Sequence, residues 1–124
     1  MSTLPRISET EWELMKIVWA RSPLTARQIV GKLIAQDPTW HPKTARTLID
    51  RLVKKQALAC RKDGRVCTFR PLVTEKECVA AVSESFLDRV FGGSLQPLLA
   101  HFVERDNLTP DEIRELQRLL NRKA

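Results

Sequence analysis

A basic helix followed directly by a basic β-hairpin is predicted over residues 41–71. Pro42 suits the first position of a helix, where a missing N–H costs nothing, and apolar residues then recur at helical spacing. Strand-forming residues flank Lys62-Asp63-Gly64-Arg65, which suits a tight turn. Nine Lys and Arg residues and only two Asp residues lie in this segment. These are the parts of a winged helix-turn-helix, which places the helix in the DNA major groove and the hairpin along the backbone.

The positive charge is confined to the first part of the chain. Residues 1–71 contain 14 Lys and Arg and six Asp and Glu, whereas the remaining residues contain seven and nine. This asymmetry indicates that only the first part contacts a polyanion. A solvated surface that happens to be basic is the alternative, and the concentration of charge on one helix and one hairpin argues against it.

Two capping boxes predict two further helices ahead of this segment. In each box a hydroxyl group accepts from the backbone three residues later, and the Glu or Gln there reaches back. The pairs are Ser8 with Glu11 and Thr25 with Gln28, and a proline ends each helix. Residues 1–72 are therefore predicted to form a winged-helix domain. Its hairpin must lean on the helices, because two strands alone are marginally stable.

The N-terminal residues of the third helix are the candidates for contacts to DNA bases, because a recognition helix reads base edges with that end. Arginine can bind guanine through two hydrogen bonds, and threonine offers a hydroxyl group and a methyl group. The candidate base contacts are Lys43, Thr44, Arg46 and Thr47. An ordinary exposed helix face is the alternative.

Basic residues farther along the helix and in the hairpin are candidates for phosphate contacts, which position a protein on DNA without reading sequence. They are Arg51, Lys54, Lys55, Arg61, Lys62 and Arg65. Trp40, just before the helix, has two interpretations. Either its ring packs in the turn, which is the interpretation that the residue type favours, or its indole N–H donates to a phosphate.

Residues 73–124 are predicted to form three helices that mediate dimerisation, so that the fold is mostly α with a small β-hairpin wing. The helices are expected to start near Thr74, Ser94 and Thr109. About 50 residues cannot easily bury so many large apolar side chains alone. A second copy of the chain would cover them, and folding back onto the first domain is the alternative. The candidate interface residues are Phe86, Val90, Leu95, Leu98, Leu99, Phe102, Val103, Ile113, Leu116, Leu119 and Leu120.

The three cysteines, Cys60, Cys67 and Cys78, are an odd number without zinc-ligand spacing, which fits a reducing compartment. A two-residue Asp-Gly hairpin loop would place Cys60 opposite Cys67 and would make a redox switch feasible. A three-residue loop with a bulge would instead place Cys60 opposite Val66. The alternative to a switch is that the cysteines are small buried apolar side chains.

No pattern indicates catalysis, a metal or a cofactor. The histidines are His41 and His101, and the sequence has no Gly-rich phosphate loop, HExxH motif or nucleophile elbow. No apolar run approaches the roughly 18 residues that span a bilayer, and the N-terminus lacks a signal-peptide core. We therefore expect a cytoplasmic protein that is not an enzyme.

Four separated blocks resemble the penicillinase-repressor family of beta-lactamase and methicillin-resistance repressors and their copper-responsive relatives. The blocks are ISETEWELMKIVW, WHPKTARTLIDRLVKKQAL, GRVCTFRP and SFLDRVFGGSLQPLLAHFVE, and the resemblance covers residues 5–122. It implies a cytoplasmic homodimer with an N-terminal winged helix and a C-terminal helical dimerisation region. Such a dimer binds a palindromic DNA operator and represses beta-lactamase or penicillin-binding-protein genes.

The resemblance also implies how repression ends. In the antibiotic-responsive branch, a membrane-bound sensor protease detects a beta-lactam, and the repressor is then cut at an Asn–Phe bond in its dimerisation region. The corresponding bond here is His101–Phe102, with histidine in place of asparagine. Cutting this helix would remove apolar dimer contacts, and a monomer loses the second half-site.

Two other departures from the family affect the interpretation. Arg46 stands where the family often has glutamine, which predicts a different operator sequence. The copper-responsive members carry Cys-x-Cys pairs near the C-terminus, and this chain ends in LLNRKA, which argues against copper sensing.

The sequence thus predicts a dimeric winged-helix repressor of a beta-lactam resistance operon that is released by proteolysis. One alternative is a regulator on the same scaffold that responds to a metal, a redox signal or a small ligand. Another is a winged helix that binds proteins and not DNA. Lys43, Arg46, Arg51 and Arg65 suit a polyanion better than a protein groove.

Overall fold

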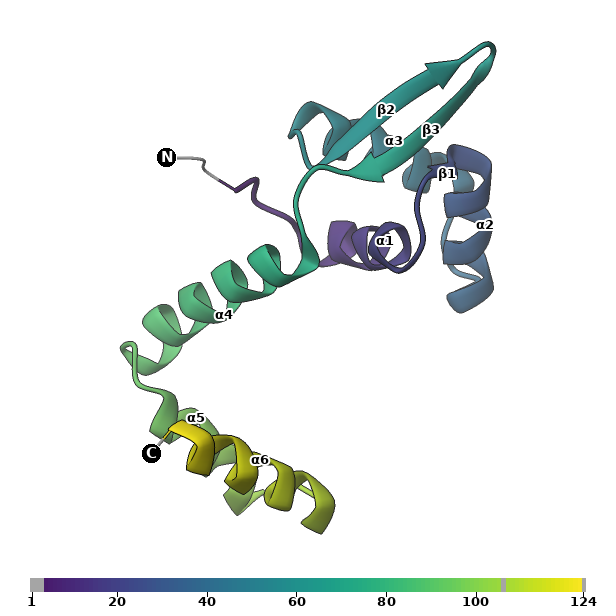
Figure 1. Ribbon diagram of the computed structural model, residues 1–124. Helices are drawn as coiled ribbons and strands as arrows, with labels where there is room; N and C mark the ends of the chain where they lie inside the picture. The colour runs from purple at the N-terminus through teal and green to yellow at the C-terminus, as the bar shows by residue number, and fades with distance from the viewer. Residues whose placement is uncertain (1–3, 106, 124) are drawn as a thin grey trace. The chain divides into compact units, whose positions relative to one another are not determined.

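The computed structural model describes residues 4–105 and 107–123. Its elements follow in the order α1 (Glu9–Ala20), β1 (Leu24–Thr25), α2 (Ala26–Gln36), α3 (Pro42–Lys54), β2 (Leu58–Asp63), β3 (Val66–Pro71), α4 (Glu75–Phe91), α5 (Leu95–Glu104) and α6 (Pro110–Lys123) (Figure 1). Two compact units are present, the first ending at Ala81 and the second beginning at Val82. The predicted mostly helical fold with a small β-wing is confirmed. None of the described helices is both long and apolar enough to cross a membrane.

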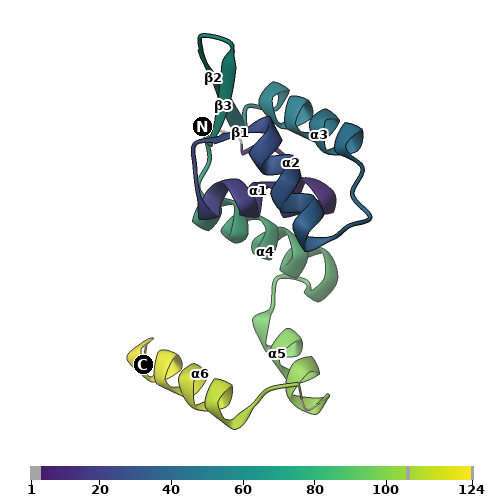
Figure 2. The same cartoon turned by 90° about the vertical axis from the view of Figure 1, so that its right-hand side faces the viewer.

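Three helices and a three-stranded antiparallel sheet lie in the first unit. The strand order is β1-β3-β2, and the β2–β3 hairpin extends beyond the helices as the wing (Figure 2). The sequence did not predict β1, which pairs Leu24 with Phe69 and Thr25 with Thr68. This short strand ties the base of the wing to the connection between α1 and α2, so the wing does not rest on two strands alone.

The predicted capping boxes begin the helices as expected. Ser8 Oγ accepts from the backbone N–H of Glu11 at 3.2 Å, while Glu11 Oε1 accepts from the N–H of Ser8 at 2.8 Å. Thr25 and Gln28 make the same pair of bonds at 3.1 and 2.8 Å at the start of α2. Each box satisfies N–H groups that the first helical turn leaves without a partner.

The core of the first unit is shared by all three helices and the base of the wing. Its largest fully buried apolar side chains are Leu14, Met15 and Val18 from α1, Ile29 and Leu33 from α2, Ile49 and Leu52 from α3, and Leu58 from β2. Each such side chain contributes roughly 1.5–3 kcal/mol relative to exposure. Because α3 buries one face in this core, its opposite face is fixed towards solvent.

The C-terminus of α3 turns into the wing through a residue in the left-handed region. Gln56 has φ of 65°. Its N–H donates to Val53 O at 3.0 Å, and the N–H of Ala57 donates to Leu52 O at 2.9 Å. These two bonds form a Schellman motif, whose left-handed position is usually glycine.

The hairpin loop differs from both predicted registers. Asp63 pairs with Val66, so the loop is Gly64-Arg65, one residue later than an Asp-Gly loop. Gly64 has φ of 66° at the first loop position, which is where a type II′ hairpin requires glycine. As a result Cys60 pairs with Phe69, and Lys62 pairs with Cys67.

The cysteines are also not all small buried apolar side chains. Cys60 and Cys67 form a disulfide, with their Cα atoms 6.1 Å apart, although they are not directly opposite in the ladder. They occupy diagonal positions on one face of the hairpin, because each pairs with a residue that lies two positions along the strand from the other cysteine. Cys78 in α4 is free and buried.

The second unit contains the rest of α4, together with α5 and α6. The helices start where the sequence predicted, and Thr109 with Glu112 forms a capping box at 3.1 and 2.9 Å before α6. Neither α5 nor α6 contains a buried residue among those described. The apolar faces of these helices are therefore uncovered in a single chain.

Candidate nucleic-acid interface

The recognition-helix candidates lie on the exposed face of α3. Ala45, Leu48, Ile49 and Leu52 on the other face are 0–5% exposed. Helical geometry therefore turns the remaining positions outward. The exposed side chains include the four predicted base contacts, Lys43, Thr44, Arg46 and Thr47, and also Arg51 and Lys54.

The N-terminus of α3 is fixed by two local features. Pro42 occupies the first helical position, as predicted. The side chain of His41 caps the helix, because its Nδ1 accepts from the backbone N–H of Lys43 at 3.1 Å. No sequence pattern indicated a specific role for this histidine, since Ser, Thr, Asp and Asn are the usual capping residues. The cap holds the first turn, which carries the candidate base contacts.

Thr47 has part of its hydrogen-bonding capacity occupied within the helix. Its Oγ1 donates to Lys43 O at 3.0 Å. The hydroxyl proton is therefore used by the backbone, while the oxygen lone pairs and the methyl group stay exposed. Thr47 in this rotamer can accept a hydrogen bond from a base or contact a thymine methyl group.

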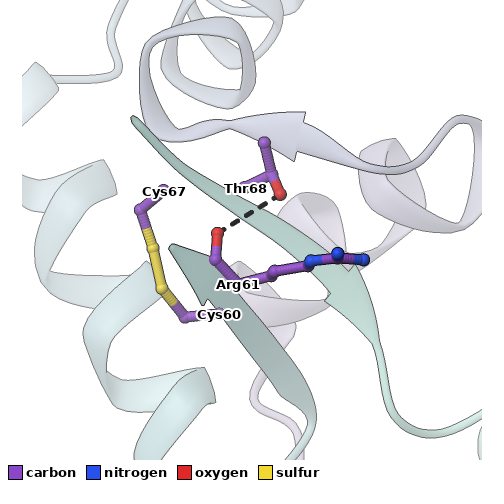
Figure 3. Close-up of a disulfide and its surroundings, with 4 residues drawn as sticks. All are labelled: Cys60, Arg61, Cys67 and Thr68. Carbon is purple, nitrogen blue, oxygen red and sulfur yellow. Dashed lines mark hydrogen bonds between the residues drawn. A yellow bond between two sulfur atoms is a disulfide. The ribbon is translucent and has the colours of Figure 1, made fainter. Parts of the chain in front are cut away.

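The basic residues of the wing lie at its exposed end. Arg61, Lys62 and Arg65 are all exposed. Arg61 pairs with Thr68, whose Oγ1 donates to Arg61 O at 3.5 Å, close to the disulfide (Figure 3). Arg61 and Lys62 are consecutive on one strand and so face opposite sides of the hairpin. Positive charge is therefore present on both sides of the wing and at its loop.

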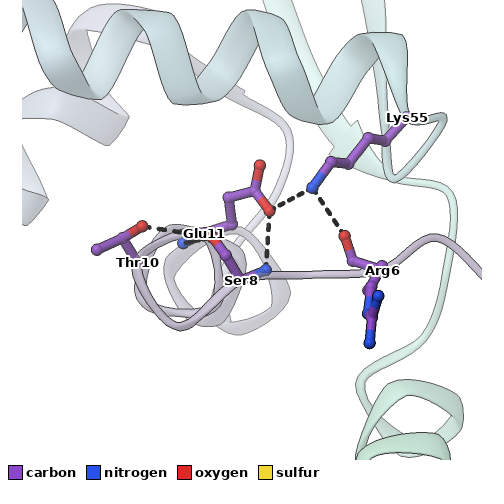
Figure 4. Close-up of polar contacts among 5 residues, drawn as sticks. All are labelled: Arg6, Ser8, Thr10, Glu11 and Lys55. Carbon is purple, nitrogen blue, oxygen red and sulfur yellow. Dashed lines mark hydrogen bonds and ion pairs between the residues drawn. The ribbon is translucent and has the colours of Figure 1, made fainter.

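Lys55 has a partner within the chain. Its Nζ lies 2.6 Å from Glu11 Oε1 and donates to Arg6 O at 2.8 Å (Figure 4). Glu11 is completely buried, and among the described residues its Oε2 has no hydrogen-bond partner. This ion pair connects the end of α3 to the start of α1. Because the ammonium group is used there, we do not retain Lys55 among the proposed phosphate contacts.

The environment of Glu11 shifts its ionisation. Burial by itself raises the pKa of this carboxyl group. Hydrogen bonds from Lys55 and Ser8, together with the charge of Lys55, lower the pKa by a larger amount, so it lies below its ordinary value. Glu11 is therefore held as a carboxylate. The capping role of Glu11 was predicted from the local sequence, whereas its pairing with Lys55, 44 positions away, was not.

Trp40 is half-buried and packs against the core cluster of the first unit. This placement agrees with the packing interpretation. Contact of its indole N–H with a phosphate stays a prediction.

The candidate dimer residues of the second unit form an exposed apolar surface. A groove of about 920 Å³ lies between α5 and α6. Seven of the predicted interface residues line it, namely Leu95, Leu99, Val103, Ile113, Leu116, Leu119 and Leu120. Of the others, Phe86, Val90 and Phe102 are 39–56% exposed, and Leu98 is half-buried. An exposed apolar groove on a small helical unit is typical of a protein–protein interface.

The candidate cleavage bond, His101–Phe102, lies inside α5. Both side chains are exposed, and their rings meet edge to face with centroids 5.3 Å apart. His101 O accepts from the N–H of Arg105 at 3.2 Å, which places the bond in hydrogen-bonded helix. The last turns of α5 must therefore unwind before a protease can bind this bond as an extended strand.

Comparisons with known proteins agree with this geometry. The penicillinase repressor family model matches residues 7–122. The chain is 38% identical over 120 residues to the penicillinase repressor of Bacillus licheniformis, covering 97% of this chain and 93% of that protein. It is 38% identical over 117 residues to the methicillin resistance regulatory protein MecI of Staphylococcus aureus strain N315, covering 94% of each.

A solved structure extends the comparison to the fold. The solution structure of monomeric B. licheniformis BlaI in complex with the blaP half-operator is 38% identical and matches with a TM-score of 0.52. The match covers 62% of this chain and 93% of that one. Together, the family match and these relatives establish that the chain belongs to the penicillinase-repressor family.

Proposed function

We propose that this chain is a sequence-specific DNA-binding repressor of a beta-lactam resistance operon. The observation that carries the proposal is the polar exposed face of α3, which is fixed outward by the core on a helix whose C-terminal end leads directly into a basic wing. The relatives named as penicillinase repressor and as methicillin resistance regulator support the regulated class of gene. The half-operator complex of BlaI supports DNA as the ligand.

Within this proposal the exposed residues divide into two kinds of contact. Lys43, Thr44, Arg46 and Thr47 contact base edges, where Arg46 is suited to guanine. Arg51, Lys54, Arg61, Lys62 and Arg65 contact phosphates. Affinity should consequently fall steeply with salt, because each neutralised phosphate releases counterions.

Dimerisation through the second unit would give the protein two recognition helices for a palindromic operator. The exposed apolar groove between α5 and α6 supports a homodimer, since its lining is uncovered in one chain. A dimer with twofold symmetry matches an operator whose half-sites are related by the same symmetry.

Release by proteolysis is the third part of the proposal. A membrane-bound sensor protease would cut His101–Phe102 in the cytoplasm after detecting a beta-lactam. The position of this bond supports the idea, because α5 contributes Leu95, Leu99 and Val103 to the apolar groove on which the dimer would depend. Cutting α5 would weaken the dimer and leave monomers that bind only half-sites.

The test is binding to the DNA upstream of the chain's own gene, compared with a scrambled DNA of the same length, at about 150 mM salt. A protected palindrome bound by two copies of the chain is the expected result. Equal, weak binding to both DNAs would contradict sequence-specific repression at this promoter and would favour a protein-binding winged helix.

A further inference from the structure

The exposed end of the wing is held in shape by very few interactions. Residues 61–66 are all exposed. Among the described residues, the pairing of β2 with β3 and the bond from Thr68 Oγ1 to Arg61 O position them, and β2 is an edge strand of the sheet. A hairpin with polar, exposed side chains on both faces specifies its register weakly. This end nevertheless carries Arg61, Lys62 and Arg65, three of the proposed phosphate contacts.

The Cys60–Cys67 disulfide lies at the base of this exposed end. It joins β2 to β3 immediately before Arg61 on one strand and after Val66 on the other. It therefore encloses the basic end of the wing in a covalent loop. Its separation of seven positions makes this loop small, so that reduction restores a large part of the freedom of residues 61–66.

We propose that Cys60 and Cys67 are a site of reversible oxidation that controls the order of the wing. The two cysteines differ in exposure, since Cys60 is exposed whereas Cys67 is half-buried and packs against the core. The third cysteine, Cys78, is buried in α4 and takes no part. In a reducing compartment, disulfides that do form are usually transient and catalytic or redox-sensing.

The oxidant that we propose is a hydroperoxide, which accepts the two electrons that the two thiols lose. The exposed Cys60 thiolate attacks the peroxide O–O bond, an alcohol or water leaves, and Cys60 becomes a sulfenic acid. The sulfur of Cys67 then attacks the Cys60 sulfur, the S–S bond forms, and water leaves. The two thiols lose two electrons and two protons in total, and the peroxide gains them. A dithiol reductant reverses the reaction by thiol–disulfide exchange.

The effect on DNA rests on the proposed function. Oxidation fixes Arg61, Lys62 and Arg65 in one arrangement before binding, and pre-ordering a binding segment increases affinity by reducing the entropy lost on association. We expect the oxidised chain to bind operator DNA about three- to tenfold more tightly than the reduced chain. The increase should be similar on scrambled DNA, because phosphate contacts do not read sequence.

The experiment uses the full chain, treated with hydrogen peroxide or with a dithiol reductant. Mass spectrometry of the intact chain should show loss of two hydrogen atoms on oxidation, and alkylation after denaturation should then label Cys78 alone. The matched controls are Cys60→Ser and the double variant Cys60→Ser/Cys67→Ser. Both keep Cys78, and neither can form the bond within one chain.

DNA affinity of each form is then measured by fluorescence anisotropy. Tighter binding of the oxidised wild type, with no response in the double variant, is the expected result. Absence of the mass change, or an oxidised form that binds no more tightly than the reduced one, would overturn the proposal. The reduced chain tests the proposed function separately. If the reduced chain does not prefer operator DNA over scrambled DNA, the proposed function fails, whereas formation of the disulfide is still decided by the mass change.

Discussion

At the scale of single residues, Glu11 combines two structural functions in one buried carboxylate. It caps α1 and pairs with Lys55 at the far end of α3. Its pKa lies below the ordinary value of 4.5, although burial alone would raise it, because the bonds from Lys55 and Ser8 outweigh burial. A group with a lower pKa in the folded chain stabilises the fold above its unfolded pKa. That contribution is lost as the pH falls through the folded pKa.

The change Lys55→Met should therefore destabilise the first unit by about 2–4 kcal/mol at neutral pH, because it leaves a buried carboxylate without a partner. The loss should shrink as the pH falls and should be smallest below the lowered pKa of Glu11 in the wild type, where this carboxyl group is protonated in both proteins. Urea unfolding of both proteins at several pH values measures this loss of stability. Lys54→Met is the matched control, since Lys54 is exposed. Equal losses for the two variants, or a loss that does not depend on pH, would contradict the assignment.

Gln56 offers a change in the opposite direction. Its φ of 65° is unfavourable for a residue with a Cβ atom, whereas glycine adopts it without strain. Gln56→Gly should stabilise the chain by about 0.5–1 kcal/mol after the greater flexibility of glycine in the unfolded state is included. Thermal unfolding checks this, with Gln56→Ala as the control that keeps the strain. A lower melting temperature for the glycine variant would show that the turn is not strained.

At the scale of elements, the boundaries of the helices could be predicted because their signals are local. Each capping box joins residues only three positions apart, and Pro42 marks the start of α3 by itself. Apart from the local cap by His41, the features that were missed depend on distant residues or on one choice of register. The pairing of β1 with β3 joins Leu24 to Phe69, and a shift of one residue in the hairpin loop decided which residues face Cys60.

The candidate site shows the same division. Periodicity alone predicted which face of α3 is exposed, and the structure agrees for all four base-contact candidates. Charge alone could not separate Lys55 from its neighbour Lys54, because the carboxylate that binds Lys55 belongs to α1. Sequence therefore predicts which surface is basic more readily than it predicts which of its charges are already paired.

Two substitutions on α3 should separate base reading from phosphate contact. Arg46→Ala should weaken operator binding by about 1–3 kcal/mol and have a smaller effect on scrambled DNA. Lys54→Ala should weaken binding to both DNAs similarly and reduce the slope of log affinity against log salt by about one. Titrations on both DNAs at several salt concentrations measure these effects. The same loss on both DNAs for both variants would show that Arg46 does not read bases.

The two units differ in how they bury apolar residues. The first unit has a shared core of completely buried side chains, whereas the described residues of α5 and α6 include none. The second unit is therefore expected to obtain its core from a partner copy, and its stability should depend on protein concentration. This dependence would also explain why a single cut in α5 could end repression, since the same apolar side chains serve folding and pairing.

Leu120→Glu tests that dependence with little damage to the single chain. Leu120 lines the groove and is 60% exposed, so a charge there costs little until a second copy covers it. We expect the variant to sediment as a monomer and to bind a full palindrome at least tenfold more weakly, while its affinity for a half-site is unchanged. Asn121→Glu is the matched control, because it adds the same charge to α6 at an exposed position that does not line the groove. If Leu120→Glu still sediments as a dimer, the pairing surface lies elsewhere. If it becomes a monomer and keeps full affinity for the palindrome, binding to the two half-sites does not depend on this surface.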